Sequence, residues 1–256
     1  MLCKSPQDYA GIRTVARMTA EVLRLAADHI RPGLTTLALN DHIHALITSR
    51  GAKPLFLNYR GFPKSCCVSI NHEVIHGIPS ASRTIQPGDI VSIDVGLGYQ
   101  NYCGDCATTI AVGPVPPETT RLLDATRRAL DAGISVARAR NRVGDISHAV
   151  QTVVESAGCS VVRDFVGHGI GRRLHEDPSV PNFGKPFRGT VLRPGHVLCI
   201  EPMVNLGSHH VDTLPDKWTI TARDGLPSAH FEHMVLVTDD GPEILTLLPP
   251  EKEPTQ

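Results

Sequence analysis

The sequence predicts an α+β fold built from two related halves, and two observations carry that prediction. First, a pattern of two helices followed by several strands occurs twice along the chain. Second, the string Ile-Gln-Pro-Gly-Asp-Ile-Val-Ser-Ile-Asp at 85–94 returns as Leu-Arg-Pro-Gly-His-Val-Leu-Cys-Ile-Glu at 192–201, and a His-Gly-Ile string precedes each copy. We therefore expect residues 1–256 to form one catalytic domain in which both halves contribute to a shared site.

The first half is expected over residues 5–113. Ser5 and Pro6 are typical of a helix cap and first turn, and apolar residues at helical spacing extend this helix to a Pro-Gly pair at 32–33. A second helix of the same spacing is predicted to end near Gly51. Segments rich in β-branched residues then predict strands near 66–71, 74–78, 90–96 and 106–112.

After a proline-rich joint at 114–117 the pattern restarts, and the second half is expected over residues 118–248. It begins with a helix over 118–138 and a second helix that ends at Gly158. Strands are predicted near 160–165, 196–203, 217–223, 231–237 and 243–247. The proline-rich and charged residues 249–256 are expected to form a disordered tail.

Each repeated string ends in an acid that lies in an apolar strand. Because side chains alternate along a strand, Asp94 faces away from Ile93, and Glu201 shares its face with Cys199. Strands this apolar are usually buried on both faces, where an ionised carboxylate is costly without compensation. A bound cation would provide that compensation.

Two further acids occur in similar surroundings. Asp105 follows Asp94 by 11 residues, which is enough for one strand to turn back beside the other, and Glu232 lies in the apolar string Phe-Glu-His-Met-Val. Each of these acids, taken alone, has an ordinary structural explanation. Together with a histidine they are typical of a site for two hard or borderline divalent ions bridged by carboxylates.

Three short strings suggest other chemistry. The His-Glu-Val-Ile-His string at 72–76 matches a zinc endopeptidase pattern that requires a helix, whereas its β-branched residues favour a strand. The Cys-Gly-Asp-Cys string at 103–106 has no second pair, and the glycines of 167–171 lack the full spacing of a phosphate loop. The zinc endopeptidase remains an alternative in which His72, Glu73 and His76 are essential.

Composition restricts the partners and the compartment. The chain has 25 basic and 26 acidic side chains in no like-charged block, so neither DNA nor a membrane is expected as a partner. Seven scattered cysteines fit no disulfide framework, and the start has no apolar core of signal-peptide length. A cytoplasmic location is therefore expected. A monomer is expected because no coiled-coil or strong interface pattern occurs.

Eight short strings together indicate a family. They are Gly-Phe-Pro-Lys-Ser at 61–65, His-Gly-Ile-Pro at 76–79, Ile-Asp-Val at 93–95, Gly-Asp at 104–105, Gly-His-Gly-Ile-Gly at 167–171, Leu-His-Glu-Asp-Pro at 174–178, Ile-Glu-Pro-Met at 200–203 and Glu-His at 232–233. In these strings, their order and their spacing, the chain resembles type I methionine aminopeptidases of the minimal bacterial form, from about residue 7 to residue 247. The resemblance implies the pita-bread fold, in which two related α+β halves enclose a dinuclear metal site.

The resemblance also implies a ligand set and its cofactors. Asp105 and Glu232 would bridge two divalent ions, Asp94 would bind one of them, and His168 and Glu201 would bind the other. The ions could be cobalt, manganese, iron, zinc or nickel, since mixed oxygen and nitrogen ligands accept all of these.

The implied catalytic residues are His76, His175 and Glu201. A water bridging the two ions would become the nucleophile, and Glu201 would take its proton and pass it to the leaving amine. His76 and His175 would contact the substrate and donate hydrogen bonds to the developing tetrahedral centre. The walls of the methionine pocket would include Tyr59, Phe62, Cys67, Phe165 and Trp218. Leu174 departs from the phenylalanine that is common in bacterial relatives, which affects the expected pocket shape and not the chemistry.

The expected function is metal-dependent removal of the N-terminal methionine from nascent proteins and peptides with a small second residue, with transient ribosome contact. Two alternatives share this fold. A prolidase or X-Pro aminopeptidase usually has an additional N-terminal domain, for which the chain has no space before Ser5. A catalytically silent protein that binds RNA or the ribosome would be expected to have lost ligands, whereas all five are present.

Overall fold

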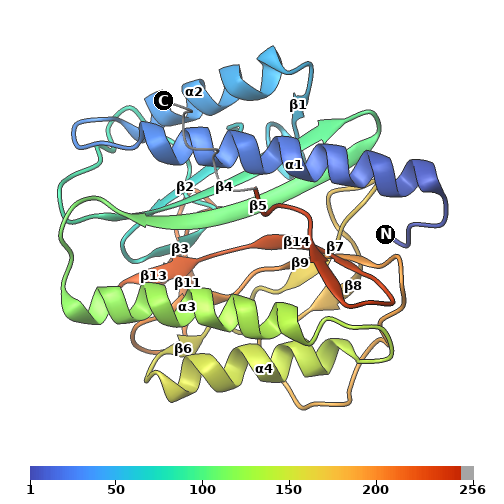
Figure 1. Ribbon diagram of the computed structural model, residues 1–256. Coiled ribbons are helices and arrows are strands. Elements are labelled where there is room, and N and C mark those ends of the chain that lie inside the picture. The colour runs from blue at the N-terminus through green and yellow to red at the C-terminus, as the bar shows by residue number, and fades with distance from the viewer. Residues whose placement is uncertain (249–256) are drawn as a thin grey trace, which may run out of the picture.

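The computed structural model describes residues 1–248, and over these residues four long helices lie on the outside of the molecule with the strands between them (Figure 1). Helices α1 and α2 cover the strands of the first half, and α3 and α4 lie at the opposite side against the second half. The predicted tail 249–256 is outside the described residues. No helix in the described part of the chain is both long and apolar enough to span a bilayer.

Helix α1 (Pro6–His29) begins where the sequence predicts. The Ser5 hydroxyl accepts a hydrogen bond from the Asp8 amide, and the Asp8 carboxylate accepts one from the Ser5 amide, so both exposed amides at the helix start are satisfied. Helix α2 (Thr36–Ser49) is capped by Thr35. Both helix predictions for the first half are confirmed.

The first-half sheet orders its strands β1-β4-β2, and β5 pairs along the whole length of β4 at its other edge. Its members are β1 (Lys53–Pro54), β2 (Cys67–Ile70), β4 (Ile90–Tyr99) and β5 (Tyr102–Ala111). The short η1 (Tyr59–Gly61) and β3 (Glu73–Ile75) lie outside it. The strand predicted at 106–112 starts earlier, because Gln100 and Asn101, with φ of 48° and 63°, form a two-residue turn that pairs Tyr99 with Tyr102.

The second half begins with α3 (Pro117–Ser135) and α4 (Val143–Ser156), as predicted. A five-stranded sheet has the order β15-β14-β9-β7-β8, and smaller sheets have the orders β13-β10-β6 and β11-β12-β3. The strands are β6 (Ser160–Val161), β7 (Gly167–Gly169), β8 (Glu176–Val180), β9 (Val197–Ile200), β10 (Met203–Asn205), β11 (Val211–Thr213), β12 (Ile220–Ala222), β13 (Ser228–His230), β14 (His233–Val237) and β15 (Pro242–Ile244).

One strand prediction was wrong in a way that affects the site. The strand predicted over 196–203 is two strands in different sheets, β9 and β10, and Glu201 and Pro202 lie between them. Pro202 has no amide hydrogen to donate to a ladder, so the pairing stops there. Strands β7, β8, β11 and β13 were not predicted, because each is short and lacks a continuous β-branched run.

One of the backbone contacts between the two halves lies at the acids. Glu232, just before β14, pairs with Ala107 of β5, and its amide donates a hydrogen bond of 3.0 Å to the Ala107 carbonyl. Separate apolar clusters fill the space on each side, one under α1 and α2 and one under α3 and α4. The bridge therefore brings acids from both halves to one place.

Candidate active site

The first two acids are neighbours across the β4–β5 hairpin. Asp94 pairs with Ala107, and Gly96 pairs with Asp105, so the two aspartates are diagonal neighbours on one face of the sheet. Ala107 also forms the bridge to Glu232. Three carboxylates thus lie on adjacent strands around Ala107.

The histidine and the fourth carboxylate come from β7 and the end of β9. The His168 Nδ1 atom lies 3.0 Å from the Gly169 carbonyl oxygen. A carbonyl can only accept, so Nδ1 carries the proton and Nε2 has a free lone pair. That Nε2 lies 3.4 Å from Glu201 Oε1 and 3.8 Å from Asp105 Oδ2. The Asn182 side chain donates to the Glu201 carbonyl at 2.9 Å and fixes the backbone there.

The structure therefore places all five residues predicted as ligands around one point. Asp105 and Glu232 are 4% and 3% exposed, and within the described chain the buried Asp94 Oδ1, Asp105 Oδ1 and Glu232 Oε1 have no hydrogen-bond partner. Buried oxygens are normally satisfied, so this cluster needs a cation or protons.

The pKa values of these side chains also indicate that the cluster needs a cation or protons. Burial raises the pKa of Asp94 to about 6. Burial, together with the carboxylates of Glu232 and Asp94, raises the pKa of Asp105 well above its usual range. Burial likewise raises the pKa of Glu201 and of Glu232. Burial lowers the pKa of His168 to about 3, so its imidazole is neutral and able to bind a metal. Four acids and one neutral histidine fit divalent cations.

The two histidines predicted to be catalytic lie beside this cluster without joining it. His76 follows β3 with φ of 59°, a conformation that few non-glycine residues adopt. Its ring meets Phe165 and Trp218 edge-on, and burial lowers its pKa to about 4. His175 Nδ1 lies 2.7 Å from the Tyr59 hydroxyl, and burial lowers the His175 pKa. Both imidazoles are neutral at pH 7 and can each donate one N–H.

A cavity of about 560 Å³ opens onto the carboxylates. Its lining includes every residue predicted for the methionine pocket, namely Tyr59, Phe62, Cys67, Phe165 and Trp218. Phe62 meets Trp218 edge-on with ring centroids 5.2 Å apart, and Leu174 also lines the cavity. The lining therefore combines apolar and aromatic side chains with the acids and the histidines.

Sequence reasoning missed several lining residues. Phe56 and Ile75 add apolar wall, and Arg60 and Arg173 add positive charge. His230, to which the sequence analysis assigns no role in the site, is 2% exposed and places Nε2 3.5 Å from Glu201 Oε2. Its position two residues before Glu232 was the available signal, because such residues share a strand face.

The string at 72–76 does not form the helix of a zinc endopeptidase. Residues Glu73–Ile75 are strand β3, and the Glu73 carboxylate accepts a hydrogen bond of 2.7 Å from the Ile70 amide. His72 does not line the cavity. The endopeptidase alternative is therefore wrong on geometry.

Comparison with known proteins decides the family. Residues 10–239 match the description of metallopeptidase family M24. The chain belongs to this family. Among M24 proteins, it is 45% identical over 246 residues to methionine aminopeptidase 1 of Bacillus subtilis (strain 168), covering 96% of this chain and 99% of that protein.

Solved M24 structures agree. The crystal structure of methionine aminopeptidase from Rickettsia prowazekii superposes with a TM-score of 0.94 at 43% identity, over 96% of this chain and 100% of that one. The Xaa-Pro dipeptidase from Bacillus anthracis has a TM-score of 0.77 at 21% identity, and this chain covers 63% of its length. The similarity to the dipeptidase shows the fold alone. The predicted family resemblance and the predicted α+β pita-bread fold are confirmed.

Proposed function

We propose that this M24 protein removes the N-terminal methionine from peptides and nascent proteins whose second residue is small. The observation that carries this proposal is the direct opening of an apolar, aromatic cavity onto the buried carboxylate cluster. High identity to methionine aminopeptidases over nearly the full length of both chains supports it.

Five side chains would hold two divalent ions. Asp105 of β5 and Glu232, whose backbone bridges to Ala107 of the same strand, come from the two halves and are the candidates to bridge them. Asp94 would bind one ion, and His168 with Glu201 would bind the other. Bound ions would supply Lewis-acid chemistry, lowering the pKa of water and polarising the scissile carbonyl. Cobalt, manganese, iron, zinc and nickel all fit this donor set.

Proton transfer and hydrogen-bond donation would be carried out by three side chains of the protein. Glu201, whose pKa is raised by burial, would accept a proton from the attacking water and return it to the leaving amine. His175, oriented by the Tyr59 hydroxyl, would donate a hydrogen bond to the oxygen on which charge develops. His76, held between aromatic rings, would provide a second donor on the cavity side.

The cavity accounts for the substrate side chain. The rings of Phe62, Phe165 and Trp218 form an apolar wall, and aromatic walls favour contact with a thioether sulfur. The substrate's free α-amine would lie against the acids, which restricts cleavage to the first residue. A formylated amine has no lone pair available there, so formylated peptides would not be cleaved.

A peptide panel tests the proposal. The metal-loaded protein is incubated with Met-Ala-Ser, formyl-Met-Ala-Ser and Ala-Pro-Ala, and products are identified by mass spectrometry. We expect methionine release from the first peptide alone. Release from Ala-Pro-Ala would support an X-Pro aminopeptidase, and no release from any peptide would support a silent binding protein.

We infer three properties of its cellular state. A cytoplasmic location is supported by all seven cysteines being unpaired thiols. Transient ribosome contact follows from a substrate whose first residue emerges there. The protein would act as a monomer, because the cavity and the five candidate ligands are all supplied by one chain.

A further inference from the structure

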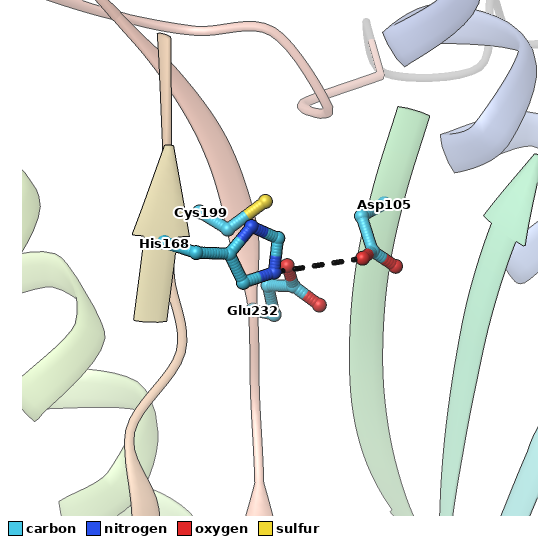
Figure 2. A group of neighbouring side chains, drawn as sticks. All are labelled: Asp105, His168, Cys199 and Glu232. Carbon is cyan, nitrogen blue, oxygen red and sulfur yellow. Dashed lines mark ion pairs between the residues drawn. The ribbon is translucent and has the colours of Figure 1, made fainter. Parts of the chain in front are cut away.

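Cys199 is a thiol at the metal centre to which the proposed reaction assigns no role. It lies on β9 directly opposite His168 of β7, and it is fully buried. Its sulfur and one ligand atom each of Asp105, His168 and Glu232 all lie within 4.8 Å of one another. In Figure 2, Asp105 faces the other three side chains across a short gap.

We propose that Cys199, His168, Asp105 and Glu232 form a second, closed coordination set for a thiophilic divalent cation such as cadmium or excess zinc. This inference rests on the metal centre proposed above. Occupation of this set would exclude the oxygen-rich set, because both require His168. Thiophilic cations would thus inhibit the enzyme through Cys199.

The spacing of the four atoms suits a small cation. Zinc binds sulfur at about 2.3 Å and nitrogen or oxygen at about 2.0–2.2 Å, which places tetrahedral ligands about 3.3–3.8 Å apart. His168 Nε2 and Asp105 Oδ2 are already 3.8 Å apart. The remaining atoms lie within 4.8 Å of one another, so they need to approach by at most about 1.0–1.5 Å.

The donors themselves are available. Asp105 Oδ1 and Glu232 Oε1 are buried without a partner in the described chain, and His168 Nε2 has its lone pair free. Coordination replaces the thiol S–H bond by a sulfur–metal bond and releases the proton to solvent. One sulfur, one nitrogen and two oxygens complete a four-coordinate site. Such a site leaves no open position for water.

Cys199 in β9 and Glu201, two residues further along the chain, are alternative ligands for a cation bound to His168. Glu201 Oε1 lies 3.4 Å from His168 Nε2 and offers a hard oxygen. Cys199 offers a soft sulfur to a cation bound by the same histidine. Oxygen donors suit manganese, and thiolates suit zinc and softer cations. The identity of the ion would therefore decide which of the two residues binds.

Cadmium binding provides a readout independent of activity. Metal-free protein is titrated with cadmium, the ultraviolet thiolate-to-cadmium charge-transfer band is recorded, and bound cadmium is counted by elemental analysis. We expect a band in the wild type that is lost in Cys199→Ser. The band should persist in Cys67→Ser, which changes the thiol lining the cavity, and in Cys159→Ser, which changes a distant buried thiol.

Manganese binding, measured in parallel, separates the possible failures. Cadmium bound without a band, or a band that survives in Cys199→Ser, would overturn the thiol site and leave the metal centre intact. Manganese bound without cadmium would do the same. Neither ion bound would overturn the metal centre as well. Near-ultraviolet circular dichroism of each variant checks that it is folded, and Cys199→Ala replaces the serine variant if that one unfolds.

Inhibition of the enzyme by zinc is a second test of the proposal. With manganese-loaded proteins, each normalised to its own uninhibited rate, Cys199→Ser should raise the inhibitory zinc concentration by at least about 10-fold, the loss typical of removing a partner from a metal site. Equal zinc sensitivity in wild type and variant would overturn the inference.

Discussion

Replacing Asp94 by asparagine should stabilise the metal-free protein at pH 7. The folded-state pKa of Asp94 is raised from 3.8 to about 6, mainly by burial. A raised carboxyl pKa means that the folded state binds the proton more tightly than the unfolded state. Stability is therefore unaffected below pH 4 and is lost as pH rises from about 4 to about 6.

The size of the effect follows from the pKa difference. Each pKa unit corresponds to about 1.4 kcal/mol, so the ionised Asp94 costs the metal-free fold up to about 3 kcal/mol at pH 7. Asparagine has nearly the same shape and no charge. Asp94→Asn should thus gain up to about 3 kcal/mol at pH 7, and nothing at pH 3.5, where both side chains are neutral.

Urea unfolding of the chelator-treated proteins measures this directly, as the free energy of unfolding at both pH values. Manganese should narrow this difference at pH 7, because an ion at 100 times its dissociation constant stabilises the wild type by about 2.7 kcal/mol and the variant by less. The reasoning is refuted if metal-free Asp94→Asn is no more stable than wild type at pH 7, or if its gain is the same at pH 3.5.

Four further predictions concern activity and metal binding. His175→Ala should lower kcat by about 100- to 1000-fold, because it removes a hydrogen-bond donor to the developing charge. Tyr59→Phe should lower kcat by about 10-fold, because the His175 ring is no longer held in position. Both values of kcat are measured with metal-saturated protein on Met-Ala-Ser. Gly167→Ala should weaken manganese binding in equilibrium dialysis, because the added Cβ would overlap the backbone carbonyl of Cys199 and displace the neighbouring His168. Manganese affinity should fall as pH drops through about 6, where Asp94 gains its proton, and calorimetry at pH 5 and pH 7.5 measures the difference.

Two of these predictions have a specific result that contradicts them, and the glycine substitution has a control. Unchanged kcat in Tyr59→Phe would mean that the 2.7 Å contact does not orient His175. Gly61→Ala is a control for the glycine substitution, because its added Cβ meets no atom within 4 Å, although its φ of +92° disfavours a side chain. Manganese affinity that is equal at pH 5 and pH 7.5 would show that no carboxylate must lose a proton on binding.

The sequence predicted most reliably what depends on neighbouring residues. The Ser5 cap of α1 and the diagonal approach of Asp94 and Asp105 across a hairpin are both local, so capping chemistry and strand alternation suffice to find them. Glu201 was placed correctly near the site but wrongly inside a continuous strand. Pro202 ends the pairing of β9 there, and its missing amide hydrogen was the signal available in the sequence.

Features that depend on distant parts of the chain were not predicted. The bridge between Ala107 and Glu232 joins the two halves, and no local pattern in either segment specifies it. Phe56 and Arg60, from the segment before β2, line the same cavity as the acids, and the local sequence does not specify this position. The proximity of Cys199 to His168 likewise requires the pairing of β7 with β9.

If the buried acids hold the metal ions that drive release of methionine, both the ions and the acids are required for activity. Mass spectrometry can detect methionine released from Met-Ala-Ser by chelated protein, by protein restored with manganese, and by Glu232→Gln under both conditions. We expect release only by restored wild-type protein. Release by the chelated protein, or restored activity in Glu232→Gln equal to wild type, would contradict it.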